Sequence, residues 1–319
     1  MRQVIGNPLS WTVRAIRDVM HTIGNVGGHV GGITQAAHEP PAGIRHLETE
    51  DIEYALQRGF EDFKAMRSDA VFLVVVYPII GIAMVALALQ SNAVHLIYPA
   101  VTGFVLVGPL AAIGLYEISK RREAGLDPSW GDAFKVFRSE SIGPIFILGL
   151  GLILIFAVWI AVARGIYALT LGPEVPESFW ALIATALTTP AGWALIIIGT
   201  GIGALFALFV LAISVISFPL LVDRETTIAT AVLTSVRVTR HNPGVILTWG
   251  VVVALMLLLG SLPLFLGLVV ALPVLGHATW HLYRRAVVPA DMPAQTDSEQ
   301  RAGGPSAMAH GHGHGHAPA

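Results

Sequence analysis

Six long apolar segments constrain the fold of this chain more than any other feature of its sequence. They lie near residues 70–90, 93–116, 142–168, 190–221, 244–262 and 263–283. The hydrocarbon core of a bilayer is about 30 Å thick, and a helix of about 20 apolar residues crosses it. Only 13% of the 319 residues are charged, about half the share of an average soluble domain. The sequence therefore predicts an all-α polytopic membrane protein with six transmembrane helices.

Polar segments precede each pair of predicted spans, so the spans group into three hairpins. These segments cover residues 50–69, 127–140 and 223–243. In the first, Ile52, Ala55 and Phe63 recur at helical spacing, and in the second Trp130 and Phe134 do the same. Amphipathic helices of this kind lie at a membrane surface with their apolar side in the headgroups. We expect three interfacial helices, one before each hairpin.

The distribution of lysine and arginine predicts the orientation of the spans. Of the 19 basic residues, 18 lie in the two tails and in the loops at residues 117–141 and 222–243, and Arg164 alone is assigned to the other side. Basic loops stay in the cytoplasm, so both termini are predicted to be cytoplasmic in an inner-membrane protein.

The spans divide the chain into three parts. Residues 1–49 are predicted to form a cytoplasmic amphipathic helix followed by a Gly/Pro linker, residues 50–286 the six-span membrane domain, and residues 287–319 a disordered His-rich cytoplasmic tail. The first apolar run begins too far from the start for a cleaved signal peptide, so we expect it to remain as an anchor.

Composition excludes several classes of function. The chain has no cysteine, which excludes disulfides, thiolate metal sites and iron–sulfur clusters. The net charge of −2 argues against nucleic-acid binding. No nucleophile elbow, phosphate-binding loop or zinc-protease motif is present, so we expect neither enzymatic activity nor a cofactor. No span carries a central carboxylate or lysine, which argues against a proton-coupled transporter.

Histidines are the candidate metal ligands. The tail sequence HGHGHGH places His310, His312, His314 and His316 on a flexible backbone, where imidazoles can chelate a divalent metal.

A second candidate is the pair His277 and His281 near the end of the last span, which share one helix face and could hold a metal ion together. The alternative is that both hydrogen-bond at the cytoplasmic interface, where Trp280, Tyr283 and Arg284 would mark the membrane boundary. We favour this second interpretation.

Four segments carry a resemblance to a known family. They are GFVLVGPLAAIGLYEISKRRE (103–123), SFPLLVDRE (217–225), HNPGVILTWG (241–250) and LPVLGHATWHLYRR (272–285). Over roughly residues 50–286 the chain resembles the bacterial integral membrane domain-of-unknown-function family 2189. Some of its members are grouped with proposed cytochrome c oxidase proteins. The resemblance implies a bacterial inner-membrane protein and hints at assembly of the respiratory membrane, but the chain lacks a haem–copper ligand set.

These observations leave three functions open. The favoured one is a non-enzymatic accessory, scaffold or assembly factor for a membrane complex such as a respiratory oxidase. The partners would then be the lipid bilayer and other membrane-protein subunits. The alternatives are a channel or transporter for a small solute, and metal binding or delivery through the histidines.

Overall fold

The computed structural model describes residues 43–65, 94–104, 108–172, 174, 176–263 and 265–288, together with 79, 82, 83, 86 and 89. The predicted N-terminal helix, most of the predicted first span and the His-rich tail lie outside these residues. Within the described part the chain is helical, and its extended pairing is an isolated antiparallel bridge between Ile44 and Val287. The predicted all-α class is confirmed for this part.

The described helices follow one another in chain order. They are α4 (Thr49–Ala65), η2 (Val94–Leu96), α6 (Ile97–Phe104), α7 (Gly108–Ala111), α8 (Ile113–Glu123), α9 (Trp130–Ala133), η4 (Phe134–Arg138), α10 (Ile142–Thr170), α11 (Phe179–Thr188), α12 (Pro190–Ser214), α13 (Ser217–Asp223), α14 (Ile228–His241), α15 (Pro243–Ser261) and α16 (Leu268–Ala286).

Three of the described helical segments have the length and apolar character needed to cross a membrane. They are α10, the continuous run of α12 and α13 over Pro190–Asp223, and α15. The predicted span at residues 93–116 is divided among η2, α6, α7 and the start of α8. The predicted last span forms α16, which is less apolar because it ends in Arg284 and Arg285. The structure thus supports a membrane protein with several apolar helices.

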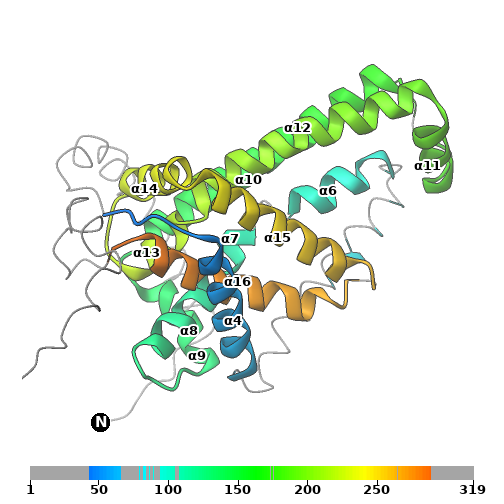
Figure 1. Cartoon of the computed structure of the whole chain (residues 1–319). Coiled ribbons are helices and arrows are strands. Elements are labelled where there is room, and N and C mark those ends of the chain that lie inside the picture. Colours follow the sequence, from blue (N-terminus) through cyan, green and yellow to red (C-terminus); the bar gives the residue numbers. More distant parts are fainter. Residues whose placement is uncertain are drawn as a thin grey trace, which may run out of the picture.

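Helices α10 and α12 run side by side and carry α11 at the end far from α13 and α14 (Figure 1). The turn between α11 and α12 is compact because the hydroxyl of Thr189 accepts a hydrogen bond from Gly192 N–H, and Pro190 occupies the first turn of α12. A Cβ on Gly192 would collide with the carbonyl oxygen of Thr185. We call α10, α11 and α12 the arm.

At the other end of the arm, α4, α8, α13 and α16 pack together (Figure 1). The predicted interfacial segments do form helices here, namely α4, α9 with η4, and α14. However, α4 buries Ile52 and Ala55 against the chain itself. This face therefore does not lie in the headgroups as the sequence pattern suggested, because α16 covers it.

Candidate functional site

Helix α4 crosses α16 at a glycine. A Cβ on Gly59 would lie 2.6 Å from the backbone nitrogen of Ala278 and 2.7 Å from the carbonyl oxygen of Val274. Only a residue without a side chain permits this approach, because both obstructing atoms belong to the backbone of α16. Asp62 lies three residues further along the same face of α4. The crossing therefore carries the Asp62 carboxylate onto the histidine-bearing face of α16.

Five polar side chains meet at this crossing, and we call them the Asp62 cluster. Asp62 comes from α4, Ser119 and Arg122 from α8, and His277 and His281 from α16. Four of them are almost fully buried: Ser119 and His277 have no exposed surface, Asp62 has 2% and His281 has 4%. The Arg122 side chain is 31% exposed.

Short contacts connect the members of the Asp62 cluster. Ser119 Oγ lies 2.6 Å from Asp62 Oδ2 and 2.7 Å from Nδ1 of His277. His281 Nε2 lies 2.9 Å from the same carboxylate oxygen. Arg122 Nη1 lies 3.1 Å from Asp62 Oδ1. Asp62 is thus the centre of the cluster, with a partner on each of the other two helices.

The surroundings keep Asp62 ionised. Burial tends to raise the pKa of this carboxyl, but hydrogen bonds from His281 and Ser119 and the nearby histidines hold its pKa below the usual value of 3.8. The donors offset the cost of burying this charge, and removing them would leave the charge uncompensated.

A second set of polar contacts anchors the last turns of α16. Trp280 Nε1–H donates to Glu123 of α8 at 3.0 Å, and the Tyr283 hydroxyl donates to Asp223 of α13 at 2.6 Å. The Lys120 ammonium donates to the carbonyls of Val222 and Asp223, both at 2.8 Å. These bonds satisfy the free carbonyls at the end of α13 and tie it to α8.

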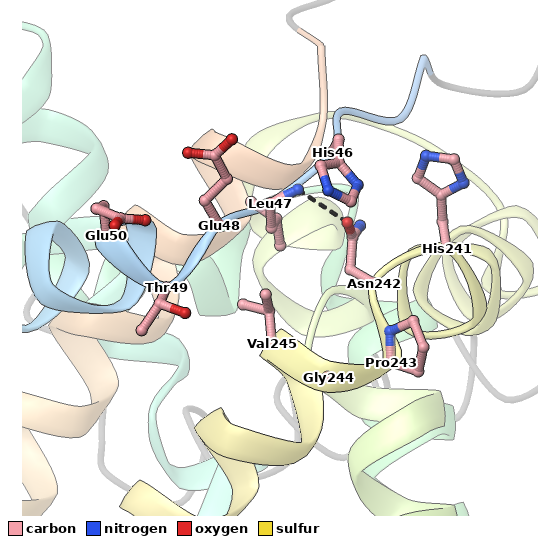
Figure 2. Close-up of a pocket in the computed structure, with 10 residues that line it drawn as sticks. All are labelled: His46, Leu47, Glu48, Thr49, Glu50, His241, Asn242, Pro243, Gly244 and Val245. Carbon is pink, nitrogen blue, oxygen red and sulfur yellow. Dashed lines mark hydrogen bonds between the residues drawn. The ribbon is translucent and has the colours of Figure 1, made fainter.

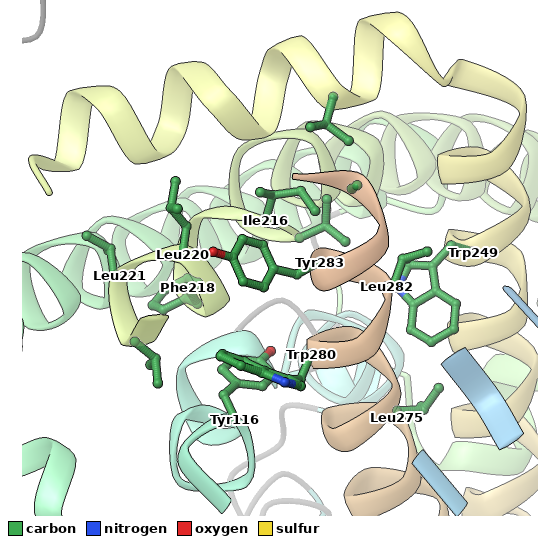
Figure 3. Packing of buried hydrophobic residues seen from close by; sticks show 14 of the residues in the cluster. Tyr116, Ile216, Phe218, Leu220, Leu221, Trp249, Leu275, Trp280, Leu282 and Tyr283 are labelled. Atoms are coloured by element: carbon green, nitrogen blue, oxygen red, sulfur yellow. The ribbon is translucent and has the colours of Figure 1, made fainter. Parts of the chain in front are cut away.

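The predicted aromatic boundary on α16 is wrong. Trp280 and Tyr283 are each 1% exposed. Figure 3 shows them pointing into the cluster of buried hydrophobic residues near Tyr116 and Phe218. They face protein because α8 and α13 pack over the end of α16, and a one-dimensional pattern cannot show that neighbouring helices cover a segment.

The structure confirms that His277 and His281 share a helix face and form hydrogen bonds there. Among the described residues no group of three histidine, aspartate or glutamate side chains is arranged to hold a metal ion. The predicted metal role of the pair stays a prediction. His310, His312, His314 and His316 lie outside the described residues.

Sequence reasoning missed Asp62, Ser119 and Arg122. The signal for Asp62 was present, because it continues the spacing of Ile52, Ala55 and Gly59 and so places a carboxylate on the buried face of an amphipathic helix. Ser119 and Arg122 carried no such signal, since α8 has no clear apolar face.

An open pocket lies beside the start of α15, away from the Asp62 cluster (Figure 2). It is lined by His46, Leu47, Glu48, Thr49, Glu50, His241, Asn242, Pro243, Gly244 and Val245. The Asn242 side chain accepts a hydrogen bond from Leu47 N–H at 2.8 Å and donates to the Arg45 carbonyl at 3.1 Å. Asn242 thus fixes the segment before α4 to the α14–α15 corner.

Comparison with known protein families identifies a match in the middle of the chain. Residues 97–223 match the model of the family described as "Predicted integral membrane protein (DUF2189)". The resemblance predicted from the sequence is confirmed over this segment, which runs from α6 to the end of α13. No curated protein and no solved structure matches the chain.

Proposed function

We propose that this integral membrane protein, which carries the DUF2189 segment at residues 97–223, is a non-enzymatic accessory or scaffold subunit of another membrane complex. Its setting would be the bacterial inner membrane, with six spans in three hairpins and both termini in the cytoplasm. The basic loops support that orientation. A respiratory oxidase is the partner that the resemblance favours.

The observation that carries the proposal is the exposure of the membrane-length helices. Only 28% of the most apolar part of α10 and 22% of that of α15 are buried within the chain. On α10, Leu150 and Leu154 are 56% and 65% exposed, although Leu152 between them has no exposed surface. A face of this kind is available to lipid or to the helices of a partner, which pack by van der Waals contact in the bilayer.

The buried polar residues where α4, α8 and α16 meet, by contrast, are engaged with one another. The Asp62 cluster is closed by hydrogen bonds between its own members. A scaffold needs a firmly held framework and an open apolar surface, and these two features together favour that role over catalysis.

Native purification in mild detergent, followed by mass spectrometry, tests the proposal. We expect the chain to co-purify with subunits of one membrane complex at fixed stoichiometry. Leu150→Trp together with Leu154→Trp should reduce that recovery by disturbing the exposed face of α10. Leu255→Trp and Leu258→Trp on the exposed face of α15 are matched controls that distinguish one binding face from general damage. A monodisperse chain with no stoichiometric partner would contradict the proposal.

A further inference from the structure

Helix α14 connects two helical segments of membrane-crossing length. Four residues separate it from the end of the run over Pro190–Asp223, and Asn242 alone separates it from the start of α15. A connection of four residues reaches less than about 20 Å even when it is fully extended. Consecutive spans leave and re-enter a bilayer at the same face, so α14 lies close to the membrane surface at that face.

The inner side of α14 is fixed to the rest of the chain. Ala231, Ser235 and Val238 have no exposed surface. The Ser235 hydroxyl oxygen accepts a hydrogen bond from the Ile216 N–H at 3.2 Å, which ties α14 to the segment between α12 and α13. Because this side is held against the protein, the rotation of α14 about its axis is set, and the opposite side faces outward.

The outer side of α14 combines an apolar residue with two arginines. Leu233 is 48% exposed, and Arg237 and Arg240 are exposed one and two turns further along. Spacings of four and three residues place all three side chains on one helix face. Helix α14 contains no aspartate or glutamate, so no carboxylate of its own offsets the two positive charges.

Other arginines near this end of the arm are already paired with carboxylates. Within the ranges that the structure describes, Arg237 and Arg240 form no ion pair. Ion pairs join Arg121 to Glu117, Arg122 to Asp62, Arg224 to Asp223, Arg284 to Glu123 and Arg285 to Asp51. The two guanidinium groups of α14 are therefore available to an anion from outside the chain.

The chemistry of this face matches a phospholipid headgroup. A guanidinium donates two parallel N–H bonds to phosphate oxygens, and arginine is suited to this partner by its planar shape. An exposed leucine on a helix at the membrane surface enters the boundary between headgroups and acyl chains. A free phosphate ion would use the arginines but not the leucine.

We propose that Leu233, Arg237 and Arg240 form a binding surface for the headgroup of an anionic phospholipid. The proposal goes beyond the scaffold role and does not depend on it, because it concerns a lipid and a different face of the molecule. Since Ser235 ties α14 to the end of the arm, a bound headgroup holds that end of the arm at the membrane surface.

Native mass spectrometry of the full chain in maltoside micelles tests the proposal, with phosphatidylglycerol added as the probe. We expect the native chain to retain phosphatidylglycerol more tightly than phosphatidylcholine. Arg237→Gln together with Arg240→Gln should weaken the apparent affinity for phosphatidylglycerol by about 30-fold, because each basic residue near an anionic surface contributes roughly fivefold. Leu233→Ser should cause a smaller loss.

Arg58→Gln together with Lys135→Gln is the matched control. It also removes two positive charges, but from side chains already paired with Glu61 and Asp132. This variant should retain phosphatidylglycerol as the native chain does. An equal loss in the control would overturn the proposal, because the attraction would then follow net charge and not the face of α14.

Three further results would overturn the proposal. One is equal retention of phosphatidylglycerol by the native chain and the double arginine variant. Another is release of the lipid by excess inorganic phosphate, which would identify a site for a soluble anion. The third is an acidic protein that co-purifies at fixed stoichiometry with the native chain and is lost from the double arginine variant.

A measurement on the native chain decides the matter if the double arginine variant does not fold. Phosphatidylglycerol with a photoreactive group on its headgroup should label α14 after irradiation in micelles, as peptide mass spectrometry would show. Labelling confined to other parts of the chain would contradict the assignment.

Discussion

The junction of α4, α8 and α16 differs from the arm of α10 to α12 in where its polar and apolar side chains lie. At the junction, buried polar groups hold three helices together through the Asp62 cluster. In the arm, apolar side chains such as Leu154 and Leu205 point out of the chain, being 65% and 66% exposed. The polar groups of the junction find their partners within the chain. The apolar side chains of the arm are left exposed by the chain and need lipid or another protein to cover them. The variants below test that difference, from the largest expected effect to the smallest.

Asp62→Ala should be the most damaging change at the junction. It leaves His281 Nε2, Ser119 Oγ and the Arg122 guanidinium without their shared acceptor, and breaking a buried ion pair from one side costs about 3–5 kcal/mol. The free energy of unfolding in micelles, followed by circular dichroism, measures the loss. Glu61→Ala on the preceding residue removes a solvent-exposed ion pair with Arg58 and an exposed hydrogen bond from Gln57, and should cost less than about 0.5 kcal/mol. Equal losses for the two variants would mean that the cluster is not the centre of the junction.

Gly59→Ala should separate the helices of the junction. The new methyl group would meet the backbone of Ala278 and Val274 at 2.6 and 2.7 Å, and such overpacking costs about 1–3 kcal/mol. The same substitution at Gly201 in the arm meets nothing within 4 Å. Alanine should be neutral or slightly stabilising there, because it favours helix more than glycine does. Thermal unfolding of the two variants in one detergent compares them, and a harmless Gly59→Ala would show that the crossing is looser than described.

Tyr283→Phe removes the hydroxyl that donates to Asp223 Oδ2 at 2.6 Å. The carboxylate is left with weaker contacts to Arg224 and Arg284, so we expect a loss of about 1–2 kcal/mol. Tyr167→Phe in the arm removes a bond to the Glu174 carbonyl, which is nearer to solvent and should cost less. Urea unfolding gives the free energy of unfolding of both variants. A larger loss for Tyr167→Phe than for Tyr283→Phe would contradict this prediction.

Leu154→Ala in the arm should have the smallest effect, below about 0.5 kcal/mol, because the side chain makes few contacts within the chain. Leu152→Ala, two residues away on the buried side of α10, is the control and should cost clearly more by leaving a cavity. Similar losses for both in micelles would show that the exposed face of α10 is covered by another copy of the chain.

Much of the architecture could be predicted from residue order alone. The apolar runs of α10, α12 and α15 exceed the length of a bilayer-crossing helix. The cap and proline at Thr189 and Pro190 locate the start of α12. The polar segments that became α4 and α14 have apolar residues at helical spacing. In each case the signal is local, since a helix satisfies its own backbone and a cap acts within one turn.

The Asp62 cluster could be predicted only in part. His277 and His281 stand four residues apart on one helix, so their shared face followed from helical geometry. Their partners are separated from them by 158 residues in the case of Ser119 and by 219 in the case of Asp62 and His281. Nothing in a single sequence links such distant positions, and the pattern of α4 was equally compatible with a lipid surface.

The sequence by itself determined that this chain forms helices and that several of them are apolar enough for a membrane. Hydropathy and the spacing of apolar residues along a helix are both properties of neighbouring residues. Only the tertiary structure decided that α4 packs on α16 and that Trp280 and Tyr283 are buried. It also brought a carboxylate, a hydroxyl and two imidazoles together. These outcomes depend on a backbone approach at Gly59, which is a relation between two helices far apart along the chain.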